Sequence, residues 1–581
     1  MRRNRVAAAA AASVAMALLA GTGVSLWQAR EARAQARIAE RERYLAEEAG
    51  DRAGQYAKRA LGVRDTYLHM LSTLMSGPGN TDGAMSGQVE QTVQVLQRHV
   101  ITDPEVRTDV LIRVADLFWS LKDRQRSDAL LAQAIEAEGQ LDPPRPDLQA
   151  DIARMQGEHL VDSDPAAALP FVERGLAALA KLPKTQDEHV LLQRIEMLFL
   201  QRGALTKLGR CREALASSGE RLAMVYSQNG ADDLRTQASL VDYAEQLADN
   251  GQLRRAEQLL RGNLRFWESR YGPVGPHQNK TALLIVQVRR FTDAGMRDAI
   301  PVLQELRVAT RRSPRMPPVD HARATALLAD QQLMTGDPAG AATSIDALAS
   351  MDYSAMPLDA DWLRSAMHMF AAELAWQRGE PAASLRESGL AVQLLGSPVA
   401  LSSGLQPMDA RLLRARARAA LGQVDAAVAE TEAVLAERAR YDQVPFASET
   451  MVKAAEVMRL SGRTVRAIEI ARAAVKDVEA TPEAGSWHRG LAQSALGLGL
   501  LDAGDAGADD ALRKADTALA RIFPASHPER LRLARAIALA GKRGRHGPFA
   551  TETVAAASVR SAASVPLRDG EPATGRPPPR N

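Results

Sequence analysis

A glycine-containing turn recurs along most of this chain at a nearly constant spacing. Copies such as LGRCREAL, NGQLRRAE and LGQVDAAV have glycines separated by 40 to 44 residues. The glycines of the eight clearest copies are Gly209, Gly251, Gly295, Gly336, Gly379, Gly422, Gly462 and Gly504. A fixed period of this size means that one supersecondary unit is repeated. We therefore expect an all-α solenoid and not a series of unrelated domains.

Each unit reads as two helices joined by the glycine turn. A glycine accepts the left-handed conformation that ends a helix, so the first helix is expected to stop there. Five residues later most copies carry an alanine, where the second helix crosses the first at close range; these are Ala214, Ala256, Ala341, Ala427 and Ala467. Degenerate copies around Lys122 and Ser163 extend the array, which predicts about ten helical hairpins over residues 89–540.

Composition excludes several classes of protein. Lys and Arg number 73 against 70 Asp and Glu, so the charge is nearly balanced and nucleic-acid binding gains no support. Cys211 is the only cysteine, which excludes an internal disulfide and a multi-cysteine metal site. Cys211 is expected to be a small core residue beside a helix turn.

Motifs that carry catalysis are absent from the sequence. The only Gly-Lys pair, Gly541-Lys542, is followed by Arg543 and not by Ser or Thr, so it is no phosphate-binding loop. Kinase signatures are missing, and the ten histidines form no metal-ligand pair. His277 and His527 are expected to pack or cap in loops. We predict no catalytic residue, no metal and no cofactor.

The N-terminus predicts a membrane anchor. Residues 1–5 form a basic tip, and residues 6–29 carry no charge. As a helix this run spans about 36 Å, enough for a hydrocarbon layer of ~30 Å. The basic tip predicts a cytoplasmic N-terminus, with the rest of the chain exported. A cleaved signal peptide ending at Ala34-Gln35-Ala36 is the alternative.

Three further segments flank the array. Residues 30–75 are charged and alanine-rich, which predicts a helical stalk, either single or forming a weak homodimer through an alanine seam. Residues 76–88 are rich in Gly and Ser and predict a flexible linker, and GAMSG within it lacks the spacing of a nucleophile elbow. Residues 541–581 predict a disordered tail, preceded by a capping helix around residues 529–539.

One cluster is a candidate ligand site. Arg411, Arg414 and Arg418 fall at i, i+3 and i+7 on a first helix, which places them on one stripe. First helices line the inner surface of such a superhelix, so the stripe could receive an acidic peptide or a C-terminal carboxylate. The alternative is a charged face balanced by neighbours such as Glu430 and Glu432.

The turns resemble those of tetratricopeptide repeats, in a variety with a period near 42 that is similar to kinesin light chains. DNGQLRRAEQLLRGNLRFWESRYGPVGPH (residues 249–277) carries the resemblance best, and FPASHPERLRLA (residues 523–534) echoes its ending. The resemblance implies a right-handed superhelix whose groove binds proteins or peptides. This favours a non-catalytic scaffold or sensor anchored in a bacterial inner membrane, with one span, the N-terminus inside and the repeats in the periplasm.

The order of segments is similar to that of another family. A basic tip, a span ending in LWQAR, a stalk, VRDTYLHMLS (residues 63–72) and a repeat array resemble the extracytoplasmic half of bacterial transmembrane serine/threonine protein kinases. The kinase domain of that family is absent from this sequence. The resemblance therefore implies an alternative function, the sensor half of a receptor kinase whose catalytic domain is missing from this chain.

Overall fold

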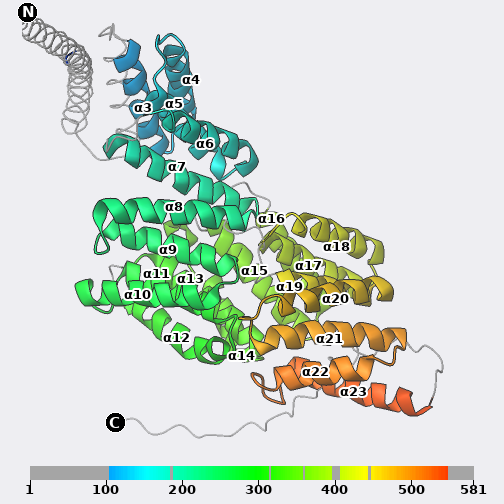
Figure 1. Cartoon of the computed structure of the whole chain (residues 1–581). Helices are drawn as coiled ribbons and strands as arrows, with labels where there is room; N and C mark the ends of the chain where they lie inside the picture. The colour runs from blue at the N-terminus through cyan, green and yellow to red at the C-terminus, as the bar shows by residue number, and fades with distance from the viewer. Residues whose placement is uncertain are drawn as a thin grey trace, which may run out of the picture. The chain divides into compact units, whose positions relative to one another are not determined.

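The computed structural model describes Arg43 and residues 104–546, except 183–187, 313–315, 357–359, 396–405 and 443–446. The predicted tip, span and linker, the stalk apart from Arg43, and the tail beyond residue 546 lie outside these residues. The described part contains twenty-one α-helices, α3 to α23, one 3-10 turn (Tyr353–Ala355) and no strand (Figure 1). Within it, no helix combines the length and the apolar character that crossing a bilayer would require.

The helices pair into ten hairpins in the described residues, followed by α23. The first helices of the hairpins are α3 (Pro104–Ser120), α5 (Pro146–Val161), α7 (Glu188–Lys207), α9 (Leu234–Asp249), α11 (Pro276–Arg289), α13 (Pro318–Met334), α15 (Ala360–Gln377), α17 (Gln406–Ala420), α19 (Ala447–Leu460) and α21 (Ser486–Ala503). The second helices are α4 (Arg124–Glu138), α6 (Pro165–Leu179), α8 (Cys211–Asn229), α10 (Leu253–Tyr271), α12 (Asp293–Arg312), α14 (Pro338–Ala349), α16 (Pro381–Leu395), α18 (Val424–Arg438), α20 (Thr464–Glu479) and α22 (Ala508–Leu519). The last helix, α23 (Pro528–His546), extends past Ala540, where the solenoid was expected to end.

Left-handed residues separate the two helices of most hairpins. Seven of the eight repeat glycines have φ between +69° and +80°, namely Gly209, Gly251, Gly336, Gly379, Gly422, Gly462 and Gly504. Lys122 holds the equivalent place in the first hairpin with φ of +64°. Several second helices then begin with an aspartate cap, such as Asp164 on α6 and Asp337 on α14, each followed by a proline that favours the first helical turn.

Gly295 departs from the expectation. It lies in the first turn of α12 and has no left-handed φ, because α11 ends earlier, at Arg289. The hydroxyl of Thr292 accepts the N–H of Gly295 at 3.1 Å and so caps α12. The turn of this repeat is therefore made by residues 290–292, and its glycine belongs to the second helix.

Small side chains allow the two helices of a hairpin to pack closely. The five alanines that follow the repeat glycines by five residues are at most 2% exposed; these are Ala214, Ala256, Ala341, Ala427 and Ala467. Larger apolar side chains of the same hairpin and of its neighbour form one core with them, as Leu253 and Leu260 on α10 and Ile285 on α11 do with Ala256. Each hairpin thus covers the apolar face of its neighbour.

The chain divides into two compact units, residues 1–152 and 153–581. The described part of the first unit consists of α3, α4 and the beginning of α5. Its core includes Ile112, Phe118 and Leu131, which are at most 5% exposed. The hydroxyl of Ser127 donates to the carbonyl of Ala115 at 2.8 Å and ties α4 to α3.

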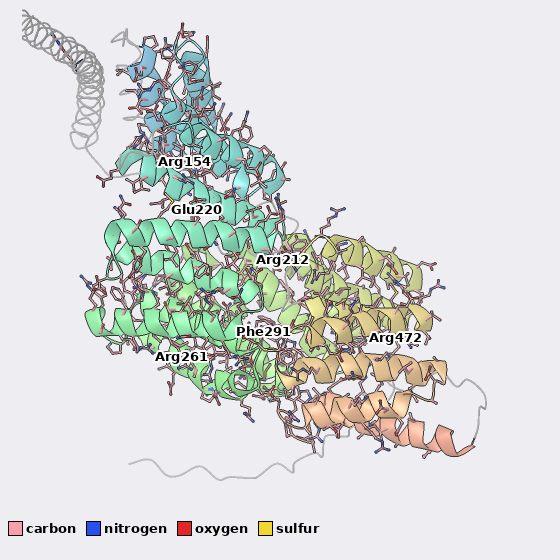
Figure 2. The ribbon with its side chains drawn as sticks, viewed as in Figure 1. Arg154, Arg212, Glu220, Arg261, Phe291 and Arg472 are labelled. Carbon is pink, nitrogen blue, oxygen red and sulfur yellow. The ribbon has the colours of Figure 1, made fainter. Side chains whose placement is uncertain are left out.

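The second unit contains the remaining helices in two arms that lie side by side (Figure 1). We call α7 to α14 the first arm and α17 to α23 the second arm; α15 and α16 connect them. The loops of one arm touch the loops of the other along a line that we call the seam. Arg212 and Phe291 lie where the green helices of the first arm meet the second arm, and Arg472 lies away from that line (Figure 2).

Side chains of one arm cap helices of the other across the seam. The helix caps of α8 and α10, Arg210 and Gln252, form no side-chain capping bond of their own. Instead, the carboxylate of Asp442 accepts the N–H of Cys211 at 2.5 Å, and that of Glu483 accepts the N–H of Arg254 at 2.8 Å. These carboxylates satisfy N–H groups that a helix start leaves without partners.

Three further contacts continue the seam, and in the first of them the carboxylate comes from the first arm. Asp293, at the start of α12, accepts the N–H of Ser486 at 2.5 Å and so caps α21. The Gly485 N–H donates to the carbonyl of Phe291 at 2.6 Å. At the far end, Nε2 of His527 lies 3.1 Å from the carbonyl oxygen of Met334, and the ring packs beside the turn. The seam therefore joins four successive hairpins of the first arm to the second arm.

Candidate binding surfaces

The first helices of the second unit carry a ladder of ion pairs between repeats. Arg416 on α17 is 6% exposed and pairs with Glu373 on α15 and with Glu456 on α19, the latter at 3.4 Å. Its guanidinium also lies 4.4 Å from the ring centroid of Trp376. Arg532 on α23 binds the other oxygen of Glu456 at 3.1 Å. Helices α15, α17, α19 and α23 are thus linked through these charges.

The ladder fixes the protonation state of Glu456. Burial alone would raise the pKa of this carboxyl, but the cations of Arg532, Arg416 and Arg459 outweigh burial and lower the pKa to about 2. Arg459 is occupied as well, since it binds Asp502 on α21 at 3.2 Å. The carboxylate and its cations therefore satisfy one another.

Arg290 forms ion pairs with residues of both arms in the interior of the unit. It binds Asp330 on α13 at 2.5 Å and lies 3.8 Å from Glu449 on α19, which belongs to the other arm. The ring of His488 stacks on Phe291 with centroids 5.5 Å apart and on Trp487 at 3.6 Å. The first helices of the two arms therefore face each other here, and charged and aromatic side chains fill the space between them.

The arginine stripe on α17 is paired with the second helix of its own hairpin. Arg411 binds Glu437 at 2.6 Å, and Arg418 binds Glu430 at 2.8 Å. Arg414 forms a two-pronged contact with the same Glu430, whose side chain is 7% exposed. The structure brings the three arginines onto one face, as expected, but a ligand carboxylate would compete with Glu430 and Glu437. Their role in peptide binding stays a prediction.

Groups that could act as nucleophile or base in the second unit are held in packing roles. Cys211 is 1% exposed, and burial raises the pKa of its thiol, so the thiolate is disfavoured. His488 is 2% exposed, and burial, aided by Arg290, lowers its pKa to about 3. His277 stacks on Trp267 with centroids 4.1 Å apart, and His527 stacks on Phe523 at the same distance. Among the described residues no group of His, Cys, Asp and Glu is arranged to hold a metal ion.

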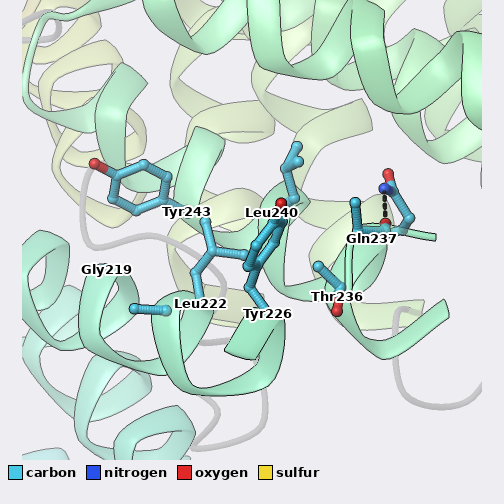
Figure 3. Close-up of a pocket in the computed structure, with 9 residues that line it drawn as sticks. Gly219, Leu222, Tyr226, Thr236, Gln237, Leu240 and Tyr243 are labelled. Atoms are coloured by element: carbon cyan, nitrogen blue, oxygen red, sulfur yellow. Dashed lines mark hydrogen bonds between the residues drawn. The ribbon is translucent and has the colours of Figure 1, made fainter. Parts of the chain in front are cut away.

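A groove opens between α8 and α9. Its volume is about 490 Å³, and its lining is mostly apolar, formed by Gly219, Leu222, Ala223, Tyr226, Ala231, Thr236, Gln237, Leu240 and Tyr243. Tyr243 lies at one end of the view in Figure 3 and Gln237 at the other, with Leu222, Tyr226 and Leu240 between them. Tyr226 is 55% exposed. We call this feature the α8/α9 groove.

Sequence reasoning did not identify the α8/α9 groove. Gly219 and Ala223 on α8 resemble the small residues that fill helix crossings, yet here they leave space above α9. Tyr226 and Tyr243 look like core residues at helical spacing. Only the exposure of Tyr226 distinguishes the site, and exposure depends on how the neighbouring hairpins pack.

No protein-family model and no curated protein matches the sequence. Solved structures that are similar to the chain include the APC/C hetero-tetramer Cut9-Hcn1, at 11% identity, with 79% of this chain and 93% of that chain covered and a TM-score of 0.39. The P58(IPK) TPR domain is 15% identical, with 68% and 99% covered and a TM-score of 0.18. A signal transduction ATPase with a tetratricopeptide repeat sensor from Pyrococcus horikoshii is 8% identical, with 79% and 72% covered and a TM-score of 0.33.

At these identities and TM-scores the likenesses carry no conclusion about function. The repeat architecture rests on the chain's own helices: ten hairpins in the described residues, left-handed turns at a period near 42 and buried alanines at the crossings. These are the features of tetratricopeptide-like hairpins. Two surfaces of this solenoid are candidate binding sites. On the inner face the charges are already paired, whereas in the α8/α9 groove apolar side chains remain exposed.

Proposed function

We propose that this protein is a non-catalytic scaffold or sensor that binds proteins or peptides on the surface of its solenoid. The observation that carries the proposal is the α8/α9 groove, where Tyr226 is 55% exposed above an apolar lining. Exposed apolar surface that is gathered in a concave site is typical of binding sites, because a partner removes it from water. The cysteine and the buried histidines, in contrast, serve packing.

The proposal includes a membrane anchor. The uncharged run at residues 6–29, with basic residues before it, supports a single span with the N-terminus in the cytoplasm. The right-handed superhelix would then stand in the periplasm of a bacterial inner membrane, on a helical stalk. The second candidate function, the sensor half of a transmembrane serine/threonine kinase, is favoured by the order of basic tip, span, stalk and repeats.

Site-specific photo-cross-linking in intact cells tests the binding function. A photoreactive benzophenone amino acid would replace Tyr226 in the groove and, in a matched control, Arg472 on the second arm, which is also exposed. We expect discrete adducts from position 226 and none from position 472. Equal adducts at both positions, or none at either, would contradict a specific binding surface in the groove.

Two further measurements separate the accompanying proposals. Protease added to spheroplasts should digest the repeats if they are periplasmic, and protection of the repeats would contradict the orientation. Kinase motifs in the DNA just upstream of the start codon would favour the sensor half of a kinase over a scaffold that acts alone.

A further inference from the structure

The α8/α9 groove has the length of a short peptide. Its lining on α9 runs from Thr236 to Tyr243, and Ala231 extends it beyond the start of the helix. Seven helical steps of about 1.5 Å separate Thr236 from Tyr243, which corresponds to ~10 Å. An extended chain rises about 3.3 Å per residue, so about three peptide residues would cover this length. The α9 side of the groove can therefore accommodate a short linear segment.

Its apolar lining selects for aliphatic or aromatic side chains. Leu222, Tyr226 and Leu240 lie between Tyr243 and Gln237 (Figure 3), and the small residues Gly219 and Ala223 complete the lining on α8. Apolar side chains of a partner would remove these groups from water. A wholly polar segment would gain nothing from this part of the groove.

Thr236 provides an unused polar group in the lining. Its side chain is 1% exposed, and its hydroxyl has no hydrogen-bond partner among the described residues. Thr325 and Thr431, in the interiors of their helices, donate to the carbonyl four residues earlier. Thr236 lies in the first turn of α9, where the residue four positions earlier is outside the helix. Its hydroxyl is thus an unpaired polar group buried in the lining of the groove.

An arginine marks the end of the groove at Tyr243. The guanidinium of Arg255 lies 5.7 Å from the centroid of the Tyr243 ring, and Arg255 forms no ion pair with the described residues. At the other end, Arg270 donates to the carbonyl of Asp232. The exposed cation of Arg255 favours a carboxylate at the Tyr243 end.

We propose that the α8/α9 groove binds a linear protein segment with apolar residues followed or preceded by an acidic residue, with the carboxylate at Arg255 and the apolar side chains over Leu222, Tyr226 and Leu240. This inference rests on the proposed binding function and adds the partner's chemistry. It places the binding site beside a second helix of the solenoid and not on the stripe of Arg411, Arg414 and Arg418.

Selection from a random dodecapeptide phage library on the full-length chain tests the proposal. Ala223→Tyr would fill the groove from an exposed helical position, and Ala216→Tyr would place the same ring on an exposed part of α8 that does not line it. Arg255→Glu would reverse the charge at the Tyr243 end. The selected peptides would be synthesised with a fluorescent label, and their binding to each variant would be measured by fluorescence polarisation.

We expect the selected peptides to combine leucine or an aromatic residue with Asp or Glu. Their binding should weaken at least tenfold in Ala223→Tyr and Arg255→Glu and stay unchanged in Ala216→Tyr. Selected peptides that bind Ala223→Tyr as well as wild type would refute the groove while leaving a binding protein in place. Selected peptides that lose binding in Ala223→Tyr could still be basic, or could bind Arg255→Glu as tightly as wild type. Either result would refute an acidic residue in the partner. A library that yields no binder would count against the proposed function itself.

Discussion

The carboxylate of Asp442 accepts the backbone N–H of Cys211 at 2.5 Å, although the two residues are 231 positions apart in sequence. A second carboxylate oxygen lies 3.3 Å from the nitrogen of Arg212. The residue at the N-cap of α8, Arg210, forms no such bond, because a guanidinium has no hydrogen-bond acceptor; its side chain pairs with Glu213. The start of α8 is thus completed by a residue from the other arm of the unit.

Asp442→Ala should destabilise the second unit and loosen the start of α8. Loss of a helix cap typically costs about 1 kcal/mol, up to ~2 kcal/mol in proteins. We expect a lower urea midpoint and faster hydrogen exchange of the amides from Cys211 to Leu215. Asp425→Ala, which removes an exposed acid from the first turn of α18, is the matched control and should change neither quantity measurably. Equal effects of both changes would show that Asp442 does not act as a cap.

Gly209→Ala should cost more stability than Gly422→Ala. Both glycines are left-handed, with φ of +72° and +80°, so both alanines carry the same backbone strain of about 1 kcal/mol. A Cβ at Gly209 would also overlap the ring of Tyr441 across the seam, whereas a Cβ at Gly422 meets nothing within 4 Å. We expect about 1–3 kcal/mol of additional destabilisation from this overlap. In a Tyr441→Ala background the two glycine changes should become equal, and a persistent difference would argue against the contact.

The three arginines of α17 should differ in their importance for stability. Glu430, which pairs with Arg414 and Arg418, is 7% exposed, whereas Glu437, which pairs with Arg411, is 36% exposed. Removing both Arg414 and Arg418 leaves a buried carboxylate without a cation and should cost about 3 kcal/mol. Arg411→Ala should cost at most about 1 kcal/mol, as expected of an ion pair near the surface. Urea unfolding measures the free energy that each variant loses. Similar losses in Arg411→Ala and in the double variant would mean that burial of Glu430 does not affect the strength of its ion pairs.

The same variants test the peptide-binding role predicted for the stripe. If replacement of all three arginines by alanine leaves the recovery of partners undiminished, the stripe has no role in peptide binding. Loss of partners in Arg411→Ala alone, which should leave the fold intact, would support it.

His488 should make the second unit less stable as the pH falls below neutrality. Burial lowers the pKa of His488 to about 3, whereas in the unfolded chain it should titrate near 6.5. Between these values the unfolded chain binds the proton and the folded chain does not, so stability falls with decreasing pH by up to about 1.4 kcal/mol per pH unit. Glu456, whose lowered pKa also favours the folded state at neutral pH, loses its contribution only as the pH falls from about 4.5 towards 2.

Unfolding midpoints between pH 7.5 and 5 therefore measure the contribution of His488 when the wild type is compared with His488→Phe. His488→Phe should reduce the slope of stability against pH in this interval. It should not abolish the slope, since burial also lowers the pKa of His321 and of His527. An unchanged slope in His488→Phe would mean that His488 takes up a proton in the folded chain.

The hairpins could be predicted because each depends on nearby residues. A glycine that accepts a left-handed φ and an alanine five residues later both act within one hairpin, as Gly422 and Ala427 do. Gly295 shows the limit of this argument, since Thr292 caps α12 earlier and moves the turn upstream. The sequence also indicated Glu430 as a neighbour of the stripe, but Glu432 binds Arg466 on the next hairpin instead.

The seam could not be predicted in the same way. It depends on the small rotation of each hairpin relative to the next, summed over about five hairpins, and no local pattern encodes that sum. A helix start without a capping residue, such as Arg210 or Gln252, is a weak signal. Gln423 and Arg463 also begin helices without a side-chain cap, and they take no part in the seam contacts described above. The α8/α9 groove was missed for a related reason, because the space above Gly219 depends on neighbouring hairpins.

The repeats of the second unit turn back until their two arms touch along the seam. Cross-linking of Arg254→Cys with Glu483→Cys tests this arrangement most directly, since Arg254 and Glu483 form an ion pair at 3.3 Å across 229 residues. The background would carry Cys211→Ala, and Arg254→Cys with Arg472→Cys would be the control pair. Treatment of the folded protein with a short bismaleimide, followed by peptide mass spectrometry, should reveal an intrachain 254–483 link and no 254–472 link. Full labelling of both cysteines without a 254–483 link would contradict the closed arrangement.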